Sequence, residues 1–214
     1  MEKLQIINKA KAFARSELGG DPSGHDWWHV WRVAKLAKRL AAEEQADAFI
    51  CELTAWLHDV ADEKLNDNEE TGLQKVELWL KEHGIDIEDQ QHILAIIQTM
   101  SFKGGGRQPM QTLEGKVVQD ADRLDALGAI GIARTFAYSG ARGQLIYDPS
   151  ITVREHLTHA AYRNEKSTAI NHFYEKLLKL KVTMNTAYGQ QLAEERHRFM
   201  LEYLDNFYKE WEEN

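Results

Sequence analysis

Hydrophobic side chains recur with the period of an α-helix along most of the chain. Between residues 2 and 18, apolar positions three and four apart form one stripe, and the pattern stops at Gly19 and Gly20. The same periodicity predicts further helices at about 27–42, 47–59, 67–83, 88–100, 112–126, 128–139, 167–182 and 185–211. Residues 116–118, which would fit a strand in isolation, have helical neighbours. With no convincing strand, repeat or flexible linker, the pattern predicts a single all-α domain.

Helix boundaries carry residues that commonly start or stop helices. Asp26 is placed to cap the second predicted helix, and Gly84 ends the fourth. Only three prolines occur in 214 residues, so long stretches lack the residue that disrupts helices most. Glycine and proline gather instead in the loop SFKGGGRQP, residues 101–109, and in residues 140–166, which we expect to be irregular.

Composition narrows the setting in which the protein works. A formal net charge of −8 argues against a general nucleic-acid or anionic-membrane surface, although a small anionic substrate would need only local cations or a metal. No apolar run approaches the ~20 residues that span a bilayer, and the N-terminus lacks the apolar core of a signal peptide. Cys51 is the only cysteine, which excludes an internal disulfide framework. We expect a cytoplasmic protein without membrane or nucleic-acid partners.

The third predicted helix ends in an unusual concentration of titratable side chains. In ELTAWLHDVADEKL, residues 52–65, an apolar run stops at His58 and Asp59. Burying an imidazole beside a carboxylate costs free energy unless something compensates, and a bound cation does so. Asp62 lies one helical turn further, on the same side as the pair. The alternative is a helix end whose polar residues meet water.

A second concentration of acid interrupts the apolar helix VVQDADRLDALGAIG. Asp120, Asp122 and Asp125 fall within six positions, although aspartate is a poor residue for a helix interior. Asp122 and Asp125 are three residues apart, where like charges repel. A cation would relieve this repulsion, and so would salt bridges with Arg123 and Lys116. The segment is therefore a second candidate for metal binding.

His29 lies near the start of the second predicted helix, a rigid place from which to aim an imidazole. Taken alone it would be an ordinary polar histidine at a helix end, and only convergence with other ligands gives it weight. Trp27, Trp28 and Trp31 surround it in the sequence. These rings could stack on a nucleobase, but we expect them to pack in the core.

In order along the chain, these residues resemble the H…HD…D signature of the HD-domain superfamily of metal-dependent phosphohydrolases. The signature covers residues 25–131, and Val33 lies four residues after the first histidine, as in the family pattern. GHDWWH, LHDVADEKL, MSFKGG and QDADRLDALGAIGIAR, with the later HFYEKLLKL, resemble one branch of small bacterial HD proteins. The resemblance implies one helical HD domain over residues 1–214, with C-terminal helices at 167–211 packed on it. The family's four metal ligands fall on His29, His58, Asp59 and Asp122.

The implied ligand set of two imidazoles and two carboxylates is mixed and fairly hard, which suits a divalent ion. Mn²⁺ is the first choice, ahead of Fe²⁺ or Mg²⁺. HD proteins with two ions generally carry further histidines after the HD pair. Here we interpret His83 as a helix-end residue and His92 as solvent-facing, which favours a single ion.

The resemblance to this branch implies nucleotide pyrophosphohydrolase activity, in which water cleaves a phosphoric anhydride. Asp62 would then orient the water or exchange a proton with it, a position that the family pattern also supports. Lys103, in the glycine-rich loop, and Lys64 would neutralise phosphate charge. Arg134 and Arg142 are weaker candidates for the same task. From composition alone the loop could equally be a flexible connector, because its spacing is not that of a Walker loop.

Three functions stay open. The first is hydrolysis of (deoxy)nucleoside triphosphates to monophosphate and pyrophosphate. The second is a nucleotide phosphomonoesterase or phosphodiesterase, which product analysis would separate from the first. The third is a protein that binds a metal or a nucleotide without turnover, and the complete ligand set together with Asp62 argues against it. The expected partner is a small-molecule nucleotide, and a homodimer stays open.

Overall fold

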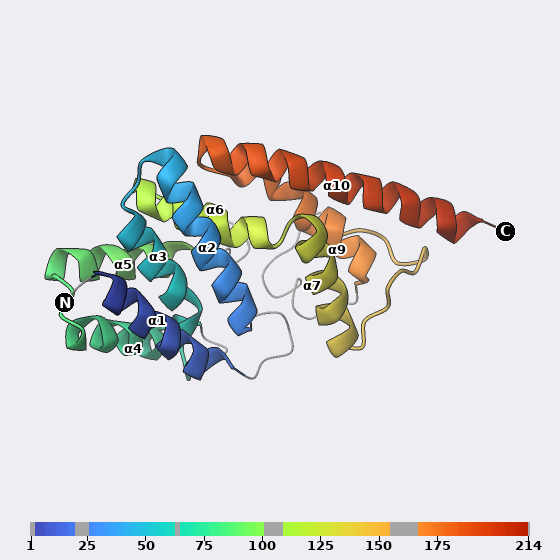
Figure 1. Ribbon diagram of the computed structural model, residues 1–214. Coiled ribbons are helices and arrows are strands. Elements are labelled where there is room, and N and C mark those ends of the chain that lie inside the picture. The colour runs from blue at the N-terminus through green and yellow to red at the C-terminus, as the bar shows by residue number, and fades with distance from the viewer. Residues whose placement is uncertain (1–2, 20–25, 63–64, 101–108, 155–166, 214) are drawn as a thin grey trace. The chain divides into compact units, whose positions relative to one another are not determined.

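The computed structural model describes residues 3–19, 26–62, 65–100, 109–154 and 167–213, and within these ranges every regular element is a helix (Figure 1). The α-helices are α1 (Lys3–Leu18), α2 (Trp27–Glu44), α3 (Ala48–Leu57), α4 (Glu69–Glu82), α5 (Ile87–Met100), α6 (Leu113–Asp125), α7 (Gly128–Ala141), α9 (Ala169–Glu175) and α10 (Ala187–Glu212). Three 3-10 helices accompany them, η1 (His58–Ala61), η2 (Leu177–Lys179) and η3 (Lys181–Thr183). The prediction of an all-α protein is confirmed. Among the described helices, none combines the length and the apolar character needed to cross a bilayer.

The described residues form two compact units, and the boundary between them falls within α6. The first unit contains α1 to α5, η1 and α6 as far as Ala121. The second unit continues from Asp122 and contains α7, α9 and α10. The division into two units does not test whether residues 1–214 form one domain. The single domain therefore stays a prediction.

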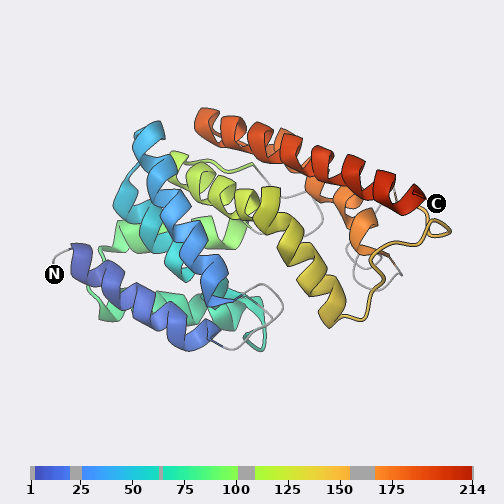
Figure 2. The ribbon, with the colours of Figure 1, turned by 45° about the vertical axis from the view of Figure 1, so that its right-hand side comes forward.

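The helices α2 and α3 form the centre of the first unit, and they lie side by side in both views (Figures 1 and 2). Seven of the ten residues of α3 are buried, because α1, α2 and α5 all pack against this apolar helix. The facing stripe of α2 runs from Val30 to Ala41 and is also buried. The C-terminal end of α3, at Leu57, therefore emerges from inside the core.

Side-chain caps fix where the helices near this core begin. The Asp26 carboxylate accepts a hydrogen bond from the backbone N–H of His29 at 2.9 Å, which confirms the predicted cap of α2. Asp47 caps α3 by accepting from two backbone N–H groups of its first turn, at 2.8 and 3.1 Å. Gly84 follows α4 with φ of +68°, the left-handed conformation that glycine adopts without strain. The caps thus set the starting points of the two central helices.

One predicted helix changes character before its end. The helix expected at 167–182 is α-helical only as far as Glu175 and continues as η2 and η3. Leu177 and Leu180, three residues apart, are both buried. A 3-10 helix has three residues per turn and points such a pair to one side, so burial of this pair agrees with the tighter helix.

In the second unit α10 is the longest described helix, and it packs against α7, which also contacts α9 (Figure 2). Residues 142–154 form no helix, in line with the irregular stretch predicted at 140–166, of which residues 155–166 lie outside the described ranges. Arg154 and the buried Glu175 form an ion pair at 2.6 Å. This pair ties the irregular stretch to α9.

Candidate metal centre

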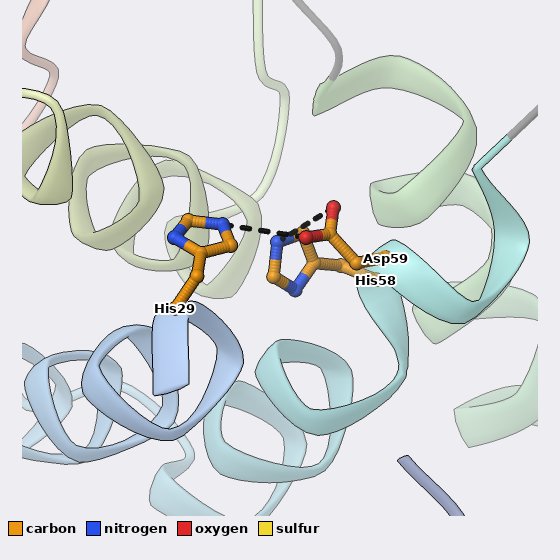
Figure 3. Close-up of side chains that lie close together, drawn as sticks. All are labelled: His29, His58 and Asp59. Carbon is orange, nitrogen blue, oxygen red and sulfur yellow. Dashed lines mark ion pairs between the residues drawn. The ribbon is translucent and has the colours of Figure 1, made fainter. Parts of the chain in front are cut away.

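Three buried side chains from two elements meet in the first unit. His29 projects from the first turn of α2, and His58 and Asp59 are the first two residues of η1 (Figure 3). One ligand atom from each residue lies within 4.8 Å of the others. His29 is 1% exposed, and His58 and Asp59 are each 8% exposed. The structure thus brings together three of the four residues predicted as metal ligands.

The adjacent residues His58 and Asp59 can face one point because an element changes there. The helix predicted over 47–59 is α-helical only to Leu57, and His58 opens the 3-10 turn η1. Neighbouring side chains diverge by about 100° inside an α-helix, so a pair reaches one point only near the end of an element. The hydrophobic pattern located this end within two residues, but it did not predict the 3-10 turn.

Hydrogen bonding sets the tautomer of His58. Its Nδ1 lies 2.8 Å from the carbonyl oxygen of Ala55, an atom that can only accept. Nδ1 therefore donates, and in the neutral ring the lone pair is on Nε2, the nitrogen 3.2 Å from Asp59 Oδ1. A backbone carbonyl behind the ring is a common means of orienting a metal-binding histidine.

The contacts among the three side chains fit a divalent cation. Asp59 Oδ1 lies 3.2 Å from His58 Nε2, and Asp59 Oδ2 lies 3.4 Å from His29 Nε2 (Figure 3). Within the described residues, His58 Nε2 makes no hydrogen bond. A lone pair on Nε2 and a carboxylate oxygen at this distance repel unless a cation lies between them. Neutral imidazole and carboxylate are both ligands of divalent metal ions.

Asp62 closes the turn that carries the ligands. It is the C-terminal cap of η1, and its backbone N–H donates to the carbonyl of Asp59 at 3.1 Å. Its side chain is partly buried, and the cluster of three does not include it. Its role in catalysis stays a prediction.

The structure does not place the three other predicted site residues relative to the cluster. Lys64 and Lys103 lie outside the described residues. Asp122, partly buried on α6, is described with the second unit. The roles of Asp122 as fourth ligand and of the two lysines as phosphate-binding cations therefore stay predictions.

An aspartate in the acidic segment of α6 forms a salt bridge, which is the alternative to metal binding in this segment. The basic partner comes from α7 and not from α6. Asp125 is 4% exposed and pairs with Arg134 of α7 at 2.7 Å. Arg134, a weaker candidate for phosphate binding, is thus engaged inside the second unit. Arg123, expected as a partner of the aspartates, donates to the carbonyl of Thr183. Sequence spacing favoured neighbours on the same helix, whereas packing selected a side chain from α7.

Two histidines outside the cluster were interpreted from their place in the sequence. His83 is a helix-end residue as predicted, with Nδ1 2.8 Å from the carbonyl of Trp79 and its ring stacked on the indole. The interpretation of His92 as solvent-facing holds only in part, because its side chain is 28% exposed. Its Nε2 lies 2.9 Å from Thr112 Oγ1 and 3.8 Å from Glu114 Oε2, so residues at the start of α6 engage the ring. Neither histidine belongs to the cluster found among the described residues, and the number of ions stays a prediction.

The tryptophans around His29 divide between core and surface. Trp27 is 7% exposed and stacks on Trp56, with ring centroids 5.3 Å apart, which confirms core packing for this residue. Trp28 is 57% exposed and meets Trp31 edge-on, so the same prediction is wrong for Trp28. Successive residues on a helix face different directions, and only one of the first two rings can point inward.

Sequence reasoning missed the residues that hold the ligands from behind. Ala55 supplies the carbonyl that orients His58, and Asn66 binds two carbonyl groups of the ligand turn. Gly72 of α4 leaves room for the Ala61 carbonyl, because a Cβ there would lie 2.4 Å from that oxygen. A glycine inside a helix was a usable signal, since glycine is a poor helix former. The carbonyl of Ala55 left no signal in the sequence.

The HD domain family matches residues 27–127, a span that includes the three clustered side chains and Asp122. The chain is similar to the protein YpgQ of Bacillus subtilis, with 41% identity over 212 residues that cover 98% of this chain and 96% of YpgQ.

Solved structures of similar proteins share the fold over nearly the whole chain. A protein from Lactobacillus plantarum has 46% identity and a TM-score of 0.84, with 97% of both chains covered. A protein described as an HD-superfamily hydrolase, from Bacillus thuringiensis, has 48% identity and a TM-score of 0.80, with 100% of both chains covered. YpgQ crystallised in complex with ADP has 40% identity and a TM-score of 0.77, covering 95% of this chain and 97% of that one.

Proposed function

The chain belongs to the HD-domain superfamily of hydrolases, and from that premise we propose that it is a metal-dependent phosphohydrolase of nucleotides. The specific reaction proposed is hydrolysis of (deoxy)nucleoside triphosphates to nucleoside monophosphate and pyrophosphate. The observation that carries the proposal is the buried cluster of His29, His58 and Asp59 in a chain similar to one crystallised with ADP. ADP contains the α–β anhydride that this reaction would break.

The proposed ligands of the ion are the three clustered residues together with Asp122. Two carboxylates balance the charge of a divalent cation, and two neutral imidazoles complete a set that leaves room for water or substrate. Mn²⁺ is the proposed metal, ahead of Fe²⁺ or Mg²⁺, with one ion in the site. When bound, the ion would polarise a phosphoryl oxygen and lower the pKa of a water molecule so that hydroxide is available near neutral pH.

Three residues of the chain are proposed to act on the substrate itself. The attacking water forms a bond to the α-phosphorus, the bond from that phosphorus to the α–β bridging oxygen breaks, and pyrophosphate leaves with the electron pair. Asp62, at the end of η1, would orient the water and accept its proton. Lys64 and Lys103 would neutralise the charge that gathers on the phosphate oxygens.

The ADP complex of the relative also fits a protein that binds nucleotides without turnover. Nucleotide binding without turnover is the second candidate function. It differs from the first because no nucleotide is hydrolysed and no product forms. A phosphomonoesterase or phosphodiesterase differs in which bond is cleaved. Each of the three therefore predicts a different set of products.

Product analysis is the experiment that tests the proposal. Purified protein would be incubated with each common nucleoside and deoxynucleoside triphosphate and Mn²⁺, and the products separated by anion-exchange chromatography. Monophosphate and pyrophosphate in equal amounts are the expected result. Diphosphate with orthophosphate would overturn the proposed bond cleavage. Calorimetric binding without products would indicate the non-catalytic alternative, and the variant His58→Ala provides the control for contaminating phosphatases.

A further inference from the structure

The turn that carries two of the clustered ligands ends in carbonyl groups that need hydrogen-bond partners. The four-residue helix η1 ends with the backbone N–H of Asp62 donating to the carbonyl of Asp59 at 3.1 Å. The next two carbonyls, of Val60 and Ala61, come too late in the turn to receive such a bond within it. Carbonyl groups at a helix end need partners from elsewhere in the structure. The side chains of Val60 and Ala61 are buried, so these partners are chiefly protein groups.

Asn66 donates hydrogen bonds to two carbonyl groups at the end of the turn. Its side-chain amide nitrogen lies 2.8 Å from the carbonyl oxygen of Val60 and 2.9 Å from that of Asp62. Both oxygens can only accept, so the amide uses both of its hydrogens on the two carbonyls. The two bonds bracket Ala61 and join the end of η1 to the chain four residues beyond Asp62.

Helix α4 holds the turn at the peptide between these two bonds. It packs against η1, and Gly72 lies where a Cβ would be 2.4 Å from the Ala61 oxygen and 2.8 Å from its carbonyl carbon. Such distances exclude any side chain at this position unless the backbone moves. The turn is therefore held by two hydrogen bonds from Asn66 and by direct backbone contact with α4.

We propose that Asn66 is a positioning residue, which fixes the backbone of η1 and so aims His58, Asp59 and Asp62. The inference rests on the proposed function only in taking His58 and Asp59 as metal ligands. A ligand turn that can rotate places donor atoms in several geometries, and groups that support ligands from behind commonly determine metal affinity. Both hydrogen bonds of the Asn66 amide go to backbone carbonyls of the turn and not to ligand side chains, so in this proposal Asn66 acts through the turn.

The test compares two asparagines on the same stretch of chain. Asn66→Ala removes both bonds to the turn, and Asn66→Asp keeps the shape but replaces the donor with an acceptor. The matched control is Asn68→Ala, which removes the cap of α4, where Asn68 Oδ1 accepts from the backbone N–H of Thr71 at 2.8 Å. The control removes a hydrogen bond at the start of α4 and leaves both Asn66 bonds in place, so it separates the loss of these two bonds from a general loss of stability in α4.

Binding and visible absorption of Co²⁺ provide a readout that does not depend on turnover. Both Asn66 variants should bind Co²⁺ more weakly, on the order of 10- to 100-fold, with changed band positions that report altered ligand geometry. Asn68→Ala should keep the wild-type spectrum and affinity. Equal spectra and affinities in all four proteins would overturn the inference, and so would equal changes in the Asn66 and Asn68 variants.

Hydrogen exchange followed by mass spectrometry gives a second measurement, which does not depend on metal binding. In the protein without added metal, peptides that cover residues 58–62 should exchange faster in Asn66→Ala than in Asn68→Ala. Unchanged exchange in Asn66→Ala would contradict the role of Asn66 in holding the turn. A protein that fails to hydrolyse nucleotides but shows both expected differences would contradict the proposed function and support the positioning role.

Discussion

Two neighbours determine the chemistry of His58, one at Nδ1 and the other at Nε2. The Ala55 carbonyl takes the Nδ1 hydrogen, and Asp59 faces the Nε2 lone pair at 3.2 Å. In its neutral form a ring held in this way presents the Nε2 lone pair to a metal ion. His29 reaches Asp59 from α2, so one carboxylate of η1 contacts a residue 30 positions earlier in the chain.

Replacing His58 or Asp59 by alanine should remove tightly bound metal and hydrolytic activity. Both side chains lie at the end of an element, so truncation should leave helical content largely intact. Metal content by mass spectrometry and circular dichroism at 222 nm would measure the two effects. Wild-type metal stoichiometry in both variants would show that the ligands have been wrongly assigned.

Asp122→Asn and Asp125→Asn should separate a ligand from a structural acid. Asp122→Asn should abolish metal binding with little effect on the free energy of unfolding. Asp125→Asn should keep the metal but lower that free energy by on the order of 1–3 kcal/mol, because the buried Asp125 loses the charge that pairs with Arg134. Metal titration and urea unfolding test both variants. The reverse pattern would exclude Asp122 as the fourth ligand.

Asp62→Asn and Lys103→Ala should both keep the metal and alter the kinetics differently. Loss of a proton-transfer group should lower kcat on the order of 10²-fold or more in Asp62→Asn. Lys103→Ala should raise KM or lower kcat/KM, because phosphate recognition is weakened. Steady-state kinetics beside calorimetric metal titration distinguish the two effects. Metal loss in Asp62→Asn, or unchanged kinetics in Lys103→Ala, would contradict the assigned roles.

At the scale of elements, the site depends on where α3 ends and on the contact between α4 and η1. The 3-10 turn η1 begins at the last buried turn of α3, and α4 packs on it through Gly72. Helical periodicity located α4 and the end of α3 within a few residues. It does not reveal which helix touches η1, because that contact joins segments separated by a loop.

Gly72→Ala should damage the metal centre even though alanine is the better helix former. Its Cβ would collide with the Ala61 carbonyl, so α4 and η1 must separate. Gly140→Ala in α7 is the matched control, since a Cβ there would meet nothing within 4 Å. The control should be neutral or stabilising by up to about 1 kcal/mol. Thermal unfolding and Co²⁺ affinity measure both variants, and equal affinities would refute the contact's importance.

At the scale of the whole molecule, pH should act on the unfolding of the second unit through His172. Burial, with a smaller contribution from Lys176, lowers the pKa of this histidine from 6.5 to about 4. The unfolded chain therefore binds a proton between these values that the folded chain does not. Since stability rises with pH wherever the unfolded state binds more protons, it should fall as pH drops from 6.5 towards 4 and lose nothing more from this group below 4.

The variant His172→Gln isolates this contribution, because glutamine does not titrate. Urea unfolding of both proteins at several pH values between 4 and 7 should give a shallower decline for the variant. Parallel declines would mean that His172 titrates alike in the folded and unfolded chains. Other acidic and basic groups titrate in both proteins, so the difference between the two curves reports His172 alone.

The helical class, most helix positions and the HD family resemblance could all be inferred from the sequence, because apolar periodicity, caps such as Asp26 and an ordered set of ligand residues are local or nearly local signals. The same signals brought His29, His58 and Asp59 forward as ligands, and the structure places these three together. Tertiary structure alone decided the features that depend on packing between distant segments. Arg134 rather than a neighbour on α6 pairs with Asp125, Thr112 and Glu114 contact His92, and Gly72 meets Ala61. Periodicity specifies which face of a helix is apolar, but the choice of partner for a polar group is made only when the faces pack and each buried donor or acceptor must find its counterpart.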